Sequence, residues 1–280
     1  MALTRVQIEE NLLESSLWKN KLLNDCNHQK IFLSNRNNNI ALYYKGGKLF
    51  SFNGDDYSTH IKYAAVIESK GKDYLTETEL RTHKLLHNFE NSYERIKENC
   101  KQYSGVEATG VSEIYNKHSY LSGEDIIVLD VEVSFKSNNE NKKQDRIDIL
   151  LFDKETKTLQ FVEAKHISNN EIWSTNTPKV ISQIKRYEEQ IKVKKTEILK
   201  RYEKHINSLN HIFNTTLPIP EKIDSKVTLL IFGFDTNQRT GRIDELIIKN
   251  PAYKGMSVYP KGNTKGLVIK NLWNANSKIL

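Results

Sequence analysis

The stretch "RIDILLFDKETKTLQFVEAKH", residues 146–166, contains two apolar runs joined by a polar segment. Each run carries one acidic residue near its outer end, Asp148 in the first run and Glu163 in the second, and Lys165 follows two positions later. Two such runs around a short polar segment are typical of a β-hairpin. The sequence therefore predicts a hairpin that carries two carboxylates at the end away from its turn.

The position of the turn decides which residues of the hairpin lie opposite each other. We place its centre between Glu155 and Thr156, so the numbers of opposed residues add up to 311, as those of Asp148 and Glu163 do. The two acids are then expected directly across from each other, with Cα atoms about 4.5–5.5 Å apart. Side chains alternate along a strand, so Lys165 projects from the same face as Glu163.

Two carboxylates in this position repel each other, and the repulsion has to be offset. Leu150 and Phe161 flank the pair on the same face, so water cannot fully screen it. A shared proton, a basic neighbour or a divalent cation would compensate, and Mg²⁺ commonly takes one or two carboxylates together with substrate phosphate. The alternative is that both acids end their strands at the solvent, with Lys165 as a salt-bridge partner.

The composition of the 280-residue chain is that of a globular protein, and its charge suits a polyanionic partner, although many basic proteins bind none. Lys and Arg number 42 against 35 Asp and Glu, a formal net charge of +7, which suits nucleic acid. Nine basic and four acidic residues lie between Lys179 and Lys204, so much of the charge follows the hairpin directly. The absence of a long apolar run and of a hydrophobic leader predicts a cytoplasmic protein without membrane association. Cys26 and Cys100 are expected to be reduced thiols.

Residues 1–75 are expected to form a small α+β unit. A helix is predicted over about 5–24, and alternating runs on both sides of Gly46-Gly47 predict a hairpin, because the central residues of a type I′ turn need positive φ. A short strand is predicted near 61–68.

The rest of the chain predicts a mixed sheet with helices on its faces. The expected elements are a helix over 74–100, a strand over 124–135, the hairpin, a helix over 177–213 and a strand over 226–235. Thr177 can cap the second helix, with Pro178 at its first position. A meander followed by a helix and a further strand is typical of an α/β (α+β) fold. We expect the core at 76–240 and a C-terminal extension at 241–280, irregular with short strands, packed on it.

Asp148, followed by Glu163-Ala164-Lys165 at the end of the next strand, resembles the PD-(D/E)XK nuclease superfamily. The core of that superfamily, which is restriction-endonuclease-like, is a helix, a β-meander, a helix and a further strand. Ile147 stands where the proline of the motif would be. The resemblance implies that Asp148, Glu163 and the Ala164 carbonyl hold Mg²⁺, with Mn²⁺ able to substitute, and that Lys165 orients the water that attacks phosphorus.

A second resemblance lies in "QIKRY", where Gln183 and Tyr187 match the Gln-x-x-x-Tyr motif of the RecB-like branch. Residues at i and i+4 share one helical face, and in that branch the face helps to position the nucleic-acid backbone. The alternative for Tyr187 is a core aromatic side chain. Phosphate contacts are expected from the basic residues of the same segment, namely Lys185, Arg186, Lys192 and Lys195.

Many superfamily members add an acid from the first core helix. Glu79 is the candidate here, and Glu94 and Glu98 are alternatives; Glu132, in the strand before the hairpin, is a further possibility. The resemblance covers about residues 76–235 by the order of elements.

The function implied is that of a magnesium-dependent endo- or exodeoxyribonuclease in restriction, phage defence or repair. DNA is the expected partner and RNA the less favoured one, in a homo-oligomer or a larger defence or repair complex. A nucleic-acid-binding or assembly module that keeps the fold without turnover is the alternative. His83 and His87 have the spacing of two zinc ligands, but Lys84 stands where a metalloprotease has its glutamate, so ordinary helix histidines are favoured.

Overall fold

The fold is described from a computed structural model of the chain. The residues it describes are 3–36, 38–66, 84–85, 88–134, 146–174 and 177–277. The chain divides into two compact units, Met1–Thr109 and Gly110–Leu280. The division falls later than the boundary expected at 75/76, because the helix Tyr93–Gln102 packs within the first unit.

The first unit combines short helices with a four-stranded antiparallel sheet. Its helical elements are α1 (Arg5–Glu14), the π-helical η1 (Trp18–Leu22), α2 (Leu23–Asn27), α3 (Ile61–Ala64) and α5 (Tyr93–Gln102). The sheet has the order β1-β2-β3-β4, made by β1 (Ile31–Asn35), β2 (Ile40–Tyr44), β3 (Gly47–Phe52) and β4 (Tyr57–Ser58). A separate antiparallel pair joins β5 (Ala65–Val66) to β6 (Lys84–Leu85). The strand predicted near 61–68 is therefore a helical turn followed by a two-residue strand.

The predicted hairpin between β2 and β3 is confirmed, with its turn one residue earlier. Tyr44 pairs with Gly47, so Lys45 and Gly46 are the turn residues, with φ of 49° and 89°. A Cβ on Gly46 would lie 2.4 Å from the carbonyl carbon of Ala108. Both the positive φ and this close approach require glycine there.

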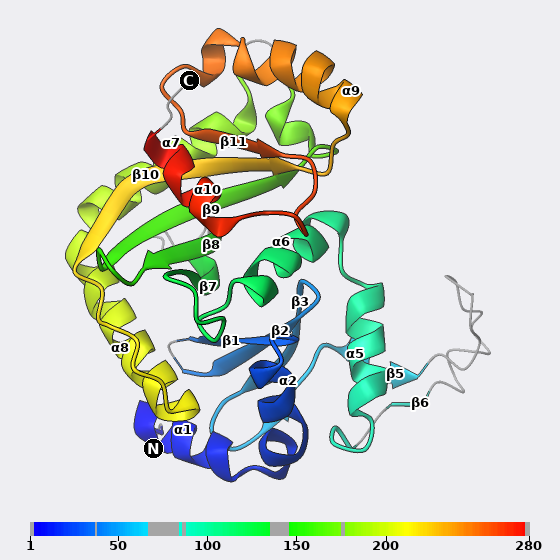
Figure 1. The fold of residues 1–280 in the computed structure, drawn as a ribbon. Helices are drawn as coiled ribbons and strands as arrows, with labels where there is room; N and C mark the ends of the chain where they lie inside the picture. The colour runs from blue at the N-terminus through cyan, green and yellow to red at the C-terminus, as the bar shows by residue number, and fades with distance from the viewer. Residues whose placement is uncertain are drawn as a thin grey trace. The chain divides into compact units, whose positions relative to one another are not determined.

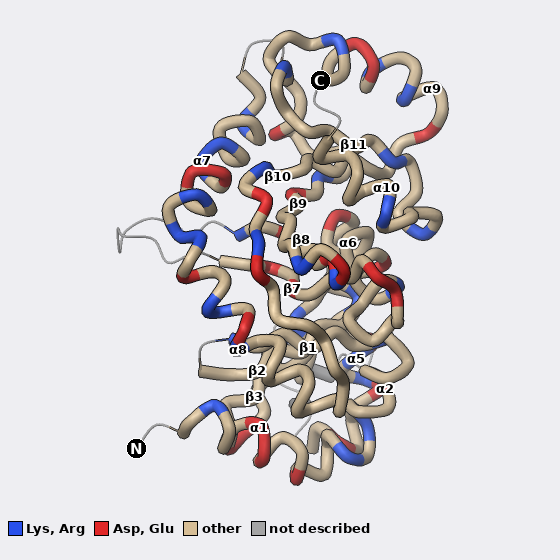
Figure 2. The backbone as a smooth tube through the Cα atoms, turned by 60° about the vertical axis from the view of Figure 1, so that its left-hand side comes forward, with Lys and Arg blue, Asp and Glu red and all other residues tan. Residues whose placement is uncertain are grey.

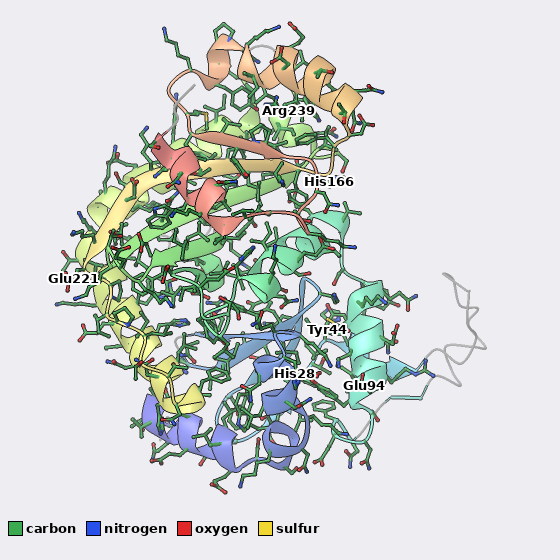
Figure 3. All side chains as sticks on the ribbon, viewed as in Figure 1. His28, Tyr44, Glu94, His166, Glu221 and Arg239 are labelled. Atoms are coloured by element: carbon green, nitrogen blue, oxygen red, sulfur yellow. The ribbon has the colours of Figure 1, made fainter. Side chains whose placement is uncertain are left out.

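A buried ion pair fixes α5 within the first unit. Lys97 Nζ lies 2.6 Å from Asp25, and the Tyr93 hydroxyl donates to the same carboxylate at 2.9 Å. The ammonium also lies 5.2 Å from the centre of the Tyr44 ring; Figure 3 labels Tyr44 and Glu94 in this region. Burial alone would raise the pKa of Asp25, but the bonds from Lys97 and Tyr93 lower it below its ordinary value. These contacts give the cluster a structural role.

The second unit is built on a five-stranded mixed sheet of order β11-β10-β9-β8-β7 (Figure 1). Its strands are β7 (Ile126–Ser134), β8 (Arg146–Asp153), β9 (Thr158–His166), β10 (Lys222–Phe232) and β11 (Val258–Lys261). β7, β8 and β9 form an antiparallel meander, whereas β10 runs parallel to β9 and β11 parallel to β10. The expected α/β (α+β) class with a mixed sheet is confirmed. β11 makes the predicted C-terminal extension a part of the sheet itself.

Helices cover both faces of this sheet, with α7 and α10 on opposite sides (Figure 1). The helical elements are α6 (Val106–Lys117), η2 (Asn170–Ile172), α7 (Lys179–Val193), α8 (Lys195–Phe213), α9 (Thr236–Gln238), the π-helical η3 (Arg239–Ile248), η4 (Pro251–Tyr253), α10 (Ile269–Asn274) and η5 (Ala275–Ser277). The helix predicted over 177–213 is two helices that meet at Lys194, and Pro178 is the N-cap residue, not the first helical one.

The helix before the meander also differs from the expectation. In the described part of 74–100, Lys84–Leu85 form a strand and helix begins only at Tyr93. The helix that directly precedes β7 is α6, which the sequence pattern did not predict. Gly110 lies inside α6, where glycine weakens a helical signal, and a Cβ there would lie 2.2 Å from the Phe232 ring. Close packing thus explains a residue that helix propensity disfavours.

Candidate active site

The register of the β8–β9 hairpin is the one that the sequence predicts. The numbers of the paired residues add up to 311 along the ladder, as far as Ile149 opposite Val162. Continued by one residue, this register places Asp148 opposite Glu163. Asp148 Oδ2 also accepts a hydrogen bond of 2.7 Å from the backbone N–H of Ala164, which ties the ends of the two strands together.

The turn residues explain why the hairpin has this register. Asp153 Oδ1 accepts from the backbone N–H groups of Glu155 and Thr156, at 3.0 and 3.3 Å, and its Oδ2 accepts from the Thr156 hydroxyl at 2.9 Å. An aspartate that binds the backbone two and three residues ahead stabilises a turn at that point. The local sequence thereby sets which carboxylates meet at the far end.

Glu163 and Lys165 are both buried and form an ion pair. Their side chains are 1% and 8% exposed, and Lys165 Nζ lies 2.8 Å from Glu163 Oε1. This confirms that the two side chains share one face. Lys165 Nζ also lies 3.2 Å from Oε2 of Glu171, in η2. Sequence reasoning missed Glu171, because nothing in the spacing of "KHISNNEI" indicates that the chain turns back towards the lysine.

The electrostatic environment favours the protonated form of Asp148. The side chain is partly buried, and this desolvation is the main reason why its pKa lies well above the ordinary value. The nearby charge of Glu163 raises the pKa further, while the Ala164 N–H and Lys165 oppose the shift. A strongly shifted carboxyl beside a second carboxylate is typical of functional sites, although ion-pair networks produce it as well.

Glu132 lies in β7 at the level of Asp148. The residues on either side of Glu132 pair with those on either side of Asp148 in β8, and the Glu132 charge adds to the rise in the pKa of Asp148. Glu132 has φ of 51°, a left-handed conformation inside a strand. Such strain costs about 1–3 kcal/mol and is concentrated at functional sites. Its carboxylate lies 3.3 Å from Arg146 Nη1.

The Gln-x-x-x-Tyr pair connects α7 to β8. Gln183 Nε2 donates to the Tyr187 hydroxyl at 2.7 Å, and that hydroxyl donates to the carbonyl of Arg146 at 2.7 Å. Tyr187 is 0% exposed, as a core aromatic would be. The pair therefore holds β8 two residues before Asp148. A direct role of Gln183 and Tyr187 in binding nucleic acid stays a prediction.

α7 and α8 lie over the sheet face that carries the acids. The hydroxyl of Tyr202, in α8, donates to Asp130 in β7 at 2.9 Å, and Asp130 pairs with Leu150, whose side chain shares the face of Asp148. At the edge of the site, β9 and β10 end together, with His166 paired to Phe232 (Figure 3 labels His166).

The predicted phosphate-contacting residues are all exposed. Lys185, Arg186 and Lys192 lie on α7, and Lys195 is the first residue of α8. Figure 2 shows that basic residues alternate with acidic ones along both helices. One of these acids, Glu188, lies 3.5 Å from Lys226.

The other candidate acids lie outside the described residues or belong to the first unit. Glu79 lies outside the described residues, as do His83 and His87. Glu94 and Glu98 are exposed on α5 in the first unit, where Glu94 lies 3.3 Å from Lys97.

The donor set of the site fits a hard divalent cation. Asp148 and Glu163 offer carboxylate oxygens from neighbouring strands, with the Ala164 peptide between them, and Mg²⁺ often takes only one or two carboxylates from a protein. Among the described residues, no three His, Cys, Asp or Glu side chains form a group that could hold a metal ion.

Comparisons with protein-family models, with curated proteins and with solved structures found no match to this chain. Over the described residues, no helix has the length and apolar character that crossing a membrane requires.

Proposed function

We propose that the second unit is a divalent-metal-dependent nuclease that hydrolyses phosphodiester bonds, with DNA as its favoured substrate. Restriction, phage defence or repair would be its setting. The observation that carries the proposal is the hairpin register, because it brings Asp148 and Glu163 together and places Lys165 on the same face. A chain that only needed a stable hairpin would gain nothing from two opposed acids.

Each residue of the site would have a separate role in hydrolysis. Asp148, Glu163 and the Ala164 carbonyl would hold Mg²⁺, which when bound supplies positive charge to the phosphate and lowers the pKa of water. Lys165 would orient the attacking water and offset charge that develops on the phosphate oxygens. Tyr187 keeps β8 in place, so the acids stay positioned. Phosphoryl transfer depends mainly on such positioning and charge neutralisation.

The charge of the protein supports a nucleic-acid substrate. The formal net charge is +7, and the exposed basic residues of α7 and α8 follow the site in the sequence. Basic surfaces attract the phosphate backbone without reading its sequence. Exposed lysines bind the phosphates of DNA and of RNA, so both nucleic acids are compared in the assay.

The test is a cleavage assay with plasmid DNA, single-stranded DNA and RNA, in Mg²⁺, Mn²⁺ or chelator. We expect cleavage only with metal, and none by Asp148→Asn or Glu163→Gln. The matched control is Glu155→Gln, an exposed acid in the turn of the same hairpin, which should cleave like the wild type. Cleavage that survives chelator or either site variant would overturn the proposal.

A second candidate is a nucleic-acid-binding or assembly module without turnover. The observation in its favour is that Lys165 already bridges Glu163 and Glu171, so the charge of the buried Glu163 is compensated without a cation. Such a module would bind nucleic acid in chelator, show no heat of metal binding in calorimetry and cleave none of the substrates.

A further inference from the structure

Glu171 is a third carboxylate at the candidate site, and it contacts the lysine rather than the other acids. Its Oε2 lies 3.2 Å from Lys165 Nζ, while Glu163 Oε1 lies 2.8 Å from the same nitrogen. The side chain of Glu171 is 44% exposed, against 1% for Glu163. The ammonium therefore lies between a buried carboxylate and one at the solvent boundary.

The position of Glu171 is held by its surroundings. It belongs to the short helix η2, where the side chain of Asn169 caps the turn by accepting from the Glu171 N–H at 3.0 Å. The buried hydroxyl of Tyr253 donates to the carbonyl of Ile172 at 2.8 Å, which ties the turn to η4. A half-exposed glutamate on an unsupported loop would contribute little, but here the backbone on both sides of Glu171 is fixed.

We infer that Glu171 is the positioning residue for Lys165. The inference rests on the proposed function, which makes Lys165 the group at the reacting phosphate. A cation at Asp148 and Glu163 would compete with the ammonium for Glu163 Oε1, because both are positive. A lysine whose side chain is only 8% exposed loses its counter-charge at a high cost in free energy. Glu171 remains a carboxylate partner for the ammonium, so Lys165 stays in position while Glu163 binds the cation.

The first test measures metal affinity in a double-mutant cycle. Titration calorimetry with Mn²⁺ and Mg²⁺ compares the wild type with Glu171→Gln, Lys165→Ala and the double variant. We expect Glu171→Gln to weaken metal binding about tenfold, as for coupled neighbours, because Lys165 then competes harder for Glu163. With Lys165→Ala in place, Glu171→Gln should change the affinity by less than twofold. An equal loss in both backgrounds would make Glu171 a ligand or a distant charge and overturn the inference.

The second test separates positioning from folding. In the wild-type background we expect Glu171→Gln to lower kcat about tenfold with KM unchanged, and Glu171→Asp to restore part of the loss. Glu155→Gln, in the hairpin turn, is the control and should change neither constant. A rise in KM with kcat unchanged, or no rescue by aspartate, would contradict a positioning role.

Failure of this inference can be told apart from failure of the proposed function. The side-chain ammonium signal of Lys165 in ¹⁵N NMR reports the contact without metal or substrate, and we expect it to weaken through faster proton exchange in Glu171→Gln but not in Glu155→Gln. If the wild type cleaves DNA while Glu171→Gln changes neither this signal nor metal affinity, the inference alone fails. If the signal responds but the wild type neither binds metal nor cleaves, the nuclease proposal fails and Glu171 is only part of a structural ion pair.

Discussion

At the scale of single residues, the main feature of the site is the carboxyl group of Asp148, whose surroundings disfavour its charged form. Asp148 is desolvated and faces Glu163, and both effects raise its pKa. The Ala164 N–H and Lys165 oppose them without cancelling them. The folded protein thus binds a proton at Asp148 more tightly than the unfolded chain does.

This predicts how the stability of the metal-free protein depends on pH. The folded-state pKa of Asp148 is raised, so the folded protein accommodates the protonated side chain better than the charged one. The pKa in the unfolded chain is about 4. The contribution of Asp148 to the free energy of unfolding therefore falls as pH rises from about 4 through the raised folded-state pKa. Asp148→Asn cannot ionise, yet it keeps an oxygen that can accept from Ala164. We expect the variant to be more stable than the wild type at neutral pH, with the difference shrinking towards pH 4. Denaturant unfolding at several pH values measures it, and a less stable variant at neutral pH would contradict it.

A second prediction separates the chemistry of Lys165 from its charge. The side chain is 8% exposed, and a guanidinium is planar, larger and practically never deprotonated. We expect Lys165→Arg and Lys165→Ala both to lose turnover by about 100-fold, as other misplaced positioning groups do. Single-turnover rates, with metal binding by calorimetry, provide the measurement. Near wild-type cleavage by Lys165→Arg would leave only the acids as catalytic residues.

At the scale of secondary-structure elements, local signals predicted the β8–β9 and β2–β3 hairpins but neither the position of Glu171 nor the helix α6. The β8–β9 register could be predicted because it depends on a turn that Asp153 stabilises within three residues. The place of Glu171 depends on the bond between Tyr253 and Ile172, which are 81 residues apart, and no periodicity contains that information. The same holds for α6, where Gly110 follows from its close contact with Phe232.

The connection between α7 and β8 leads to a prediction about Tyr187. Tyr187→Phe removes the hydroxyl that joins Gln183 to the Arg146 carbonyl, and losing such a buried bond costs about 1–3 kcal/mol. We expect kcat to fall with little change in DNA affinity, because β8 carries Asp148. Tyr202→Phe on α8 is the matched control, since its hydroxyl binds Asp130 instead, and it should lose stability but not kcat. Weaker DNA binding by Tyr187→Phe would point to direct contact with the substrate.

The exposed face of α7 leads to a prediction about salt. Lys185 and Lys192 are seven residues apart, so they lie on the same side of the helix. If both contact phosphates, Lys185→Gln with Lys192→Gln should reduce the slope of log affinity against log salt by about 0.9 per contact on duplex DNA. Fluorescence anisotropy in chelator prevents cleavage during the measurement. The exposed Lys254, changed to Gln, is the control, and a slope unchanged by the double substitution would place the DNA elsewhere.

At the scale of the whole molecule, the candidate site belongs to one of two units. Asp148, Glu163, Lys165 and Glu171 all lie in the second unit, Gly110–Leu280. Its sheet includes strands from both the hairpin and the C-terminal segment, since β11 extends it beyond β10. The first unit has a sheet, buried apolar side chains and a buried ion pair of its own. Each unit thus has the core that independent folding requires.

This organisation predicts that metal stabilises only part of the protein. Calorimetric unfolding of the full chain should show two transitions, and Mn²⁺ or Mg²⁺ should raise only the one that belongs to the second unit. A ligand at 100 times its Kd stabilises the folded state that binds it by about 2.7 kcal/mol. Two variants assign the transitions to the units. Asp25→Asn should lower the midpoint temperature of the first unit's transition, because it breaks the buried pair with Lys97. Asp148→Asn should remove the effect of metal on the second unit's transition. A metal-induced rise in the first transition, or one that survives Asp148→Asn, would place the cation outside the hairpin.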